Sequence, residues 1–307
     1  MQLYLPIADI PVNVFLILAM GAAVGFVSGM FGIGGGFLMT PLLIFLGISP
    51  AVAVATVSSH IAASSFSGAI TYWRRKALDL SLAAMLLIGG IAGTAAGVGL
   101  FTYLRALGQL DLTISLSYVL LLGSVGGLMV AEGVRAIIRS RHGKPVELRR
   151  PGSHTWFHGL PFKLRFKQSR IYVSSIPVVT IGFIMGFIGA IMGIGGGFLL
   201  VPMLIYFLRV PTATVIGTSM VLTLVTMASA TVMHAATNHL VDAVLALILM
   251  VGGVIGAQFG ARTGQKMRGE RLRLLLGLLV FAVGCRFAYA LVVRPDDLYS
   301  LRYVAGG

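Results

Sequence analysis

No charged residue occurs between Asp9 and Arg74. Roughly 20 apolar residues in a helix cross the hydrocarbon core of a bilayer, so this stretch alone is long enough for about three crossings. A soluble domain has about 25% charged residues, whereas this chain has 10%, with 57% hydrophobic residues and a single cysteine, Cys285. The sequence therefore indicates a multi-pass membrane protein. It excludes a disordered chain, a coiled coil and a disulfide-stapled domain.

Charged residues divide the rest of the chain into further apolar blocks. Spans of about 20 residues give three segments before Arg74, two before a basic central stretch and five after it, about ten in all. No Lys or Arg precedes Arg74, so the first segment lacks the basic region of a cleavable signal peptide and is expected to remain. We expect a first membrane repeat at 1–138, a basic cytoplasmic loop at 139–173 and a second membrane repeat at 174–307.

The two halves share a repeated motif. Gly-Ile-Gly-Gly-Gly-Phe occurs at 32–37 and again at 193–198, and further on Asp79 matches Asp242 in nearly the same register. Each half holds about five segments, and an odd number makes the second half enter the membrane from the opposite side. The sequence therefore predicts an all-α fold of two inverted five-segment repeats with glycine-broken helices.

Basic residues support this topology independently, because Lys and Arg concentrate in cytoplasmic loops. The loop after the third segment carries Arg74, Arg75 and Lys76, whereas the matching stretch 234–242 carries no Lys or Arg. After the fourth segment the bias reverses, with Arg105 alone in the first half and five basic residues at 262–273. The central loop is then inside and the N-terminus outside.

The glycine motifs form the first candidate site. Each lies between a helix of about 20 residues and one of roughly 10 to 12, which spans only half a bilayer. Backbone N–H groups at the start of the short helix, at its positive dipole end, can bind an anion without a charged side chain. The glycines expected to bind substrate are Gly34, Gly35, Gly36, Gly195, Gly196 and Gly197. The alternative is close helix packing, which we favour instead for the regularly spaced glycines at 89, 93 and 97 and at 252, 256 and 260.

Clusters of Ser and Thr residues follow Pro50 and Pro211. They are expected roughly 12 Å from these prolines, along the helices that the prolines begin. They can donate to an anion or bond to carbonyls of the preceding turn, and the sequence leaves both open. Two interpretations of His60 stay open: it relays protons or binds substrate, or it is a neutral histidine that makes a hydrogen bond to another helix. Arg286 either extends towards the membrane surface or meets an anion. The side chains expected at the substrate site are Ser58, Ser59, His60, Thr218 and Ser219.

Enzyme chemistry has no support in the sequence. Metalloprotease, nucleophile-elbow and Walker motifs are missing, and Glu132 is the only acid well inside a segment. We expect no catalytic residue, no metal and no cofactor. The basic loop is interpreted as a topology determinant in contact with membrane lipid, and nucleic acid is not an expected partner.

Taken together, the paired Gly-Ile-Gly-Gly-Gly-Phe motifs, Gly-Thr-Ser at 217–219 and the Asp79 and Asp242 helices resemble the TauE/SafE family, the sulfite exporters and toluene sulfonate uptake permeases. The likeness extends from about Gly25 to Arg286. It implies a bacterial inner-membrane carrier of small sulfur-containing anions such as sulfite, sulfonates or sulfoacetate. The first half has Thr56-Val57-Ser58 in place of Gly-Thr-Ser, so the resemblance puts more weight on Ser219 than on Ser58.

We therefore expect a secondary-active transporter of a small anion that works by alternating access. A coupling proton or other ion and a homo-oligomer are compatible with this class. The alternatives are an anion channel, or a membrane scaffold or sensor that acts through the basic loop.

Cysteine labelling tests the topology. In a Cys285→Ser background, single cysteines at Arg105 and His239 should react with an impermeant thiol reagent from outside, and those at Arg75 and Arg268 only from inside. Labelling of positions 75 and 268 from opposite faces would exclude two inverted halves.

Overall fold

The computed structural model describes residues 2–31, 34–74, 78–141, 163–166, 169, 171–206, 212–264 and 269–292. Ten α-helices are found in this part of the chain, five in each half. Those of the first half are α1 (Val14–Phe31), α2 (Gly36–Phe45), α3 (Pro50–Arg74), α4 (Leu80–Ala106) and α5 (Leu110–Arg141). Those of the second half are α6 (Ser175–Met192), α7 (Gly197–Tyr206), α8 (Thr212–Met233), α9 (Ala243–Gly264) and α10 (Gly269–Val292), with a π-helical turn η1 (His234–Asn238) after α8.

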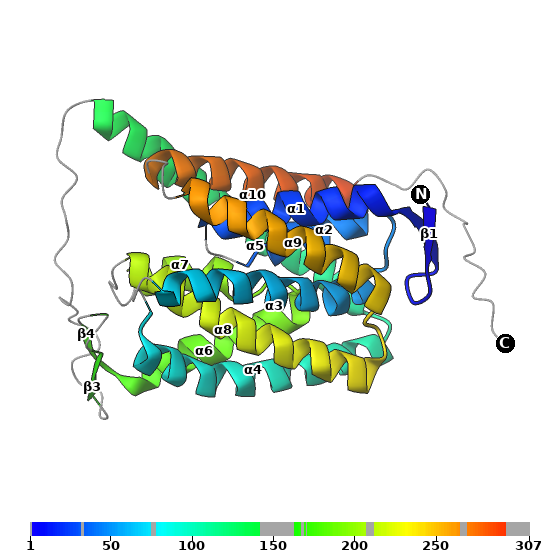
Figure 1. The fold of residues 1–307 in the computed structure, drawn as a ribbon, viewed down its shortest axis with the longest axis horizontal. Helices are drawn as coiled ribbons and strands as arrows, with labels where there is room; N and C mark the ends of the chain where they lie inside the picture. Colours follow the sequence, from blue (N-terminus) through cyan, green and yellow to red (C-terminus); the bar gives the residue numbers. More distant parts are fainter. Residues whose placement is uncertain are drawn as a thin grey trace.

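Each half begins with a short antiparallel hairpin, which the all-α prediction missed. Strands β1 (Gln2–Leu5) and β2 (Ile10–Asn13) precede α1, and β3 (Lys163–Phe166) and β4 (Ile171–Ser174) precede α6. Strands of four residues leave too little alternation to read from the sequence. The second hairpin lies inside the stretch expected to be a loop, of which 142–162 lie outside the described residues. The two hairpins lie at opposite ends of the helix bundle (Figure 1).

Six helical stretches in the described part are long and apolar enough to cross a membrane. They are 14–31, 80–106, 110–135, 175–192, 214–238 and 243–263. Large apolar side chains such as Leu120, Leu247 and Phe259 point outward from these helices, as lipid-facing residues do. Helix α3 is different, because residues 51–61 are buried without exception and include serines and a histidine. The chain is thus a multi-pass membrane protein in which α3 is an interior helix.

Close backbone contact joins helices from different halves. Helix α1 packs along α9, and α6 along α4. A Cβ added at Gly256 would overlap the Ala22 carbonyl, and one added at Gly93 would overlap the Phe183 carbonyl. The regularly spaced glycines of α4 and α9 therefore have the packing role that their spacing predicted, because only glycine allows helices to approach this closely.

Two buried aspartates tie each half to the hairpin of the other. Asp242 caps α9 by accepting from the backbone N–H groups of Val244 and Leu245 through Oδ1 (3.1 and 3.0 Å), and its Oδ2 accepts from the N–H of Ile7 in the β1–β2 turn (3.0 Å). The Asp242 N–H donates to Oγ1 of Thr56 on α3 (3.1 Å).

Asp79 makes the equivalent contacts from the first half to the hairpin of the second half. It caps α4 through Oδ1, and its Oδ2 accepts from the N–H and the hydroxyl of Ser169, between β3 and β4 (2.9 and 2.7 Å). Its own N–H points at Oγ1 of Thr218 on α8 (3.4 Å). Buried carboxylates need such donors to offset the loss of water, so each aspartate is fixed where a helix of one half meets the hairpin of the other.

Asp242→Asn separates the two functions of this carboxylate. The amide oxygen can still cap α9, but the NH₂ group then faces the Ile7 N–H, so we expect hydrogen exchange at Ile7 to accelerate roughly tenfold or more. Asp242→Ala should in addition lower stability by about 1 kcal/mol through the lost cap. Exchange mass spectrometry and thermal unfolding measure the two effects. Unchanged exchange at Ile7 in both variants would contradict the hairpin contact.

Candidate functional site

Two non-helical breaks interrupt the helices at the predicted glycines. The first precedes α2, where Gly34 and Gly35 have φ values of 85° and 71°, and the second precedes α7, where Gly195 has a φ of 69°. These left-handed values are strained for any residue with a Cβ. All six predicted glycines are buried, as non-helical backbone in a membrane has to be unless it lines a polar cavity.

The structure brings the two breaks together. Oγ1 of Thr40 in α2 donates to the Gly193 carbonyl (3.2 Å), and a Cβ on Gly36 would overlap that same carbonyl oxygen. The Phe37 and Phe198 rings, at matching positions in the first turns of α2 and α7, stack with centroids 4.8 Å apart. The N-terminal turns of both short helices therefore lie side by side at the centre of the protein.

Helices α3 and α8 supply the side chains that flank both breaks. The Cγ2 methyl of Ile61 lies 3.1 and 2.8 Å from where a Cβ on Gly34 and Gly195 would be, and the Cγ2 methyl of Thr223 lies 3.1 and 3.2 Å from the same two points. One side chain from each half thus touches both breaks, and the two segments form one site.

The electrostatic character of this site comes from the backbone. The first N–H groups of a helix have no partner within it, and they form its positive end. Neither α2 nor α7 has an acidic residue in its first turn. Within the described residues, no group of three or more His, Cys, Asp or Glu side chains could hold a metal ion. Two adjacent helix N-termini without a carboxylate favour an anion.

The predicted hydroxyl clusters lie on α3 and α8 and already have partners in the protein. Ser58 and Ser59 donate to the carbonyls of Ala55 and Thr56 (2.5 and 2.6 Å), and Ser219 donates to the Ile216 carbonyl (2.9 Å). Oγ1 of Thr218 faces the Asp79 N–H. The nearest neighbours of Gly34 and Gly195 are residues one or two turns further along the same helices.

His60 is buried between α3 and α9. Its Nδ1 lies 2.7 Å from the Leu249 carbonyl oxygen, and its ring packs on Gly253, where a Cβ would overlap it. A carbonyl oxygen can only accept, so Nδ1 donates to it, and Nε2 has no partner among the described residues. The histidine is bonded across helices, with one ring nitrogen left over.

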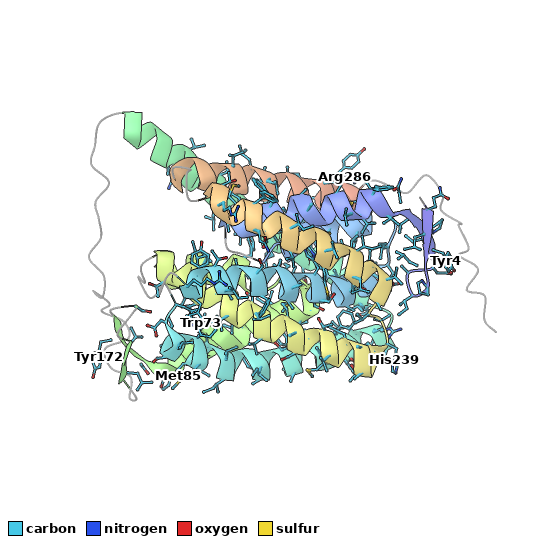
Figure 2. The ribbon with its side chains drawn as sticks, viewed as in Figure 1. Tyr4, Trp73, Met85, Tyr172, His239 and Arg286 are labelled. Carbon is cyan, nitrogen blue, oxygen red and sulfur yellow. The ribbon has the colours of Figure 1, made fainter. Side chains whose placement is uncertain are left out.

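Arg286 is an exposed residue of α10 (Figure 2). Its guanidinium carbon is 5.0 Å from the centroid of the Phe45 ring and 5.9 Å from that of Tyr289. These distances are within the range of cation–π contacts. The side chain is therefore held by aromatic rings at the surface of the bundle.

Sequence reasoning passed over three hydroxyls that the structure singles out. Ser28, Ser65 and Thr223 are buried, and their hydroxyl oxygens have no hydrogen-bond partner among the described residues. Ser65 follows Ser58 by two helical turns and Thr223 follows Ser219 by about one. Helical spacing from the predicted clusters could have suggested these two, but nothing in the sequence distinguishes them from Ser64 or Thr226.

Comparisons with known proteins place the chain among membrane transporter sequences. The sequence model of the family described as Sulfite exporter TauE/SafE matches residues 17–287. The chain is 24% identical over 285 residues to the probable membrane transporter protein YunE of Bacillus subtilis, covering 89% of this chain and 97% of YunE. It is 30% identical over 273 residues to a probable membrane transporter protein of Xylella fastidiosa, covering 86% and 90%. Sulfite exporter TauE/SafE family protein 3 of Arabidopsis thaliana is 32% identical over 129 residues, covering 40% of this chain and 26% of that protein. No solved structure matches the chain.

Gly36→Ala tests the contact between the breaks. The new Cβ would overlap Ile61 and the Gly193 carbonyl, so we expect it to push the two breaks apart and to lower the midpoint of thermal unfolding. Gly99→Ala on α4 is the matched control, because no atom lies within 4 Å of its new Cβ, and it should be neutral or slightly stabilising. Equal unfolding midpoints for the two variants would mean that the breaks do not touch.

Proposed function

The chain belongs to the sulfite exporter TauE/SafE family, and on that premise we propose that it carries small sulfur-containing anions across the bacterial inner membrane by alternating access. Sulfite, sulfonates and sulfoacetate are the proposed substrates. The observation that carries the proposal is the meeting of the α2 and α7 N-termini at two buried glycine breaks, linked by the Thr40 to Gly193 hydrogen bond and the Phe37 to Phe198 stack.

Substrate chemistry follows from this geometry. A sulfite ion and a sulfonate head group each present three oxygens that share the negative charge. Backbone N–H groups from two helix ends can each take an oxygen, and their partial positive charges stabilise an anion that has lost its water. A cation would face the same positive ends without a carboxylate to offset them.

Alternating access is supported by the symmetry of the contacts. We propose ten membrane segments in two inverted repeats, in which the 10-residue helices α2 and α7 reach about half-way across the bilayer. Equivalent elements of the two halves make equivalent contacts. Helix α1 packs on α9 in the way that α6 packs on α4, and Asp242 binds the first hairpin in the way that Asp79 binds the second. Two such halves can exchange conformations around a shared central site.

The proposed orientation places the N-terminus outside and the central loop in the cytoplasm. Trp73, beside the basic residues 74–76, lies at the same end of the bundle as Tyr172 on the second hairpin (Figure 2). His239 and Tyr4 lie at the other end, where Arg105 also donates to the Asn238 carbonyl (2.8 Å). Trp73 and the second hairpin, which border strongly basic parts of the sequence, thus share one end, and this supports a cytoplasmic position for those parts.

Anion flux into proteoliposomes tests the function. Purified protein should carry sulfite or a sulfonate at a saturable rate, whereas a channel would give conductance far above carrier turnover and a scaffold would give no flux. Gly35→Val and Gly196→Val should each abolish flux, because a branched side chain obstructs the turn and the ligand.

Gly99→Val provides the matched control, since it adds the same side chain at an open position. All variants have to be inserted and monodisperse for the comparison. Normal flux in either glycine-break variant would refute backbone binding at the breaks.

A further inference from the structure

Buried hydroxyls without a partner mark one region of the protein. Four buried side-chain atoms in the described part of the chain have no hydrogen-bond partner: Ser28 Oγ, His60 Nε2, Ser65 Oγ and Thr223 Oγ1. Burial without a hydrogen bond costs free energy, so such groups call for an explanation, and an unseen ligand is one. The three hydroxyls come from three different helices, α1, α3 and α8.

All three hydroxyl-bearing side chains border the first glycine break. Ser65 Oγ lies 3.7 Å from where a Cβ on Gly34 would be, and the Ser28 Cβ lies 2.9 Å from the corresponding point on Gly35. The Thr223 methyl lies 3.1 Å from the Gly34 point. Side chains from α1, α3 and α8 therefore converge on the backbone that leads into the positive end of α2.

Thr223 can turn its hydroxyl to the same place. A rotation of about 120° around χ1 brings the hydroxyl to the position that the methyl occupies and moves the methyl to the position of Hβ, and helical threonines occupy two χ1 rotamers. In the observed rotamer the methyl faces Gly34 and Gly195, and the hydroxyl bonds to nothing in the described part of the chain. A hydrogen bond to a ligand between the breaks would stabilise the rotamer in which the Thr223 hydroxyl faces them.

The second break does not repeat this arrangement. In the register that aligns the two glycine motifs, the counterpart of Ser28 is Gly189, which has no hydroxyl. The counterpart of Ser65 is Thr226, whose hydroxyl already donates to the Leu222 carbonyl (2.8 Å). The side chain nearest to Gly196 is that of Met185. The backbone is repeated in the two halves, but the free hydroxyls are not.

We propose that Ser28, Ser65 and Thr223 donate to the oxygens of the bound anion, which lies against the first glycine break. This inference rests on the proposed function and names the hydroxyl ligands of its site. Three hydroxyl donors beside the N–H groups of α2 match the three oxygens of sulfite or of a sulfonate head group. The substrate site is thus asymmetric even though the backbone around it is paired.

Equilibrium binding of sulfite and methanesulfonate to purified protein, measured by calorimetry, tests the inference. Ser65→Ala and Thr223→Val should weaken binding at least about tenfold, the loss of one hydrogen bond to a charged group, and Ser28→Ala should act in the same direction. Ser64→Ala and Thr226→Val are the matched controls, because these hydroxyls donate to the Ile61 and Leu222 carbonyls. The controls should bind within about twofold of the parent.

Thermal unfolding without ligand gives a second, independent signature. Removing a buried hydroxyl that has no partner should leave the unfolding temperature of Ser65→Ala and Thr223→Val unchanged or raised. A hydroxyl with a purely structural role would lower it. A stable variant with weak binding is therefore the expected combination.

Several outcomes overturn the inference, and they separate it from the proposed function. If the parent binds and Ser65→Ala and Thr223→Val bind like the parent, the hydroxyl ligands are wrong while the function stands. If Ser219→Ala weakens binding and Ser65→Ala does not, the anion lies at the predicted hydroxyl cluster instead. If the parent neither binds nor carries sulfite, methanesulfonate or sulfoacetate, the proposed function fails and this inference with it.

Discussion

Backbone polar groups in a membrane have to be satisfied within the protein, and this constraint governs the whole structure. In the described part of the chain helices meet it along most of the length, and the glycine breaks, which are not helical, are buried. There the N-terminal turns of α2 and α7 lie side by side, without an acidic residue in either first turn. The positive character of the centre is thus a consequence of interrupting two helices, and it requires no Lys or Arg.

Glycine also determines how the halves combine. Bare backbone on α4 and α9 allows α6 and α1 to approach so closely that each half packs against the other along two long seams. The two aspartates add a link at each end of the bundle, where a helix cap of one half holds the hairpin of the other.

Symmetry of the backbone does not extend to the side chains. Phe37 and Phe198 stack as equals, whereas His60, Ser28 and Ser65 have Val221, Gly189 and Thr226 at the matching positions. The repeated fold determines the course of the backbone and the position of the positive helix ends. The polar groups without partners then make the two sides of the site at the glycine breaks different.

The sequence by itself determined the membrane class, the family and the positions of the breaks, because the uncharged stretch before Arg74 and a repeated glycine motif are properties of the chain. It also identified the packing glycines from their spacing of four. It did not reveal the hairpins, whose strands are too short to show a pattern, or the hydroxyls without partners. Ser58 and Ser65 lie on the same face of α3 two turns apart, yet Ser58 accepts a hydrogen bond from Thr231 of α8 (3.0 Å), whereas the Ser65 hydroxyl has no partner among the described residues. Which polar groups remain free depends on what neighbouring helices bring to them, and that is fixed by the tertiary structure alone.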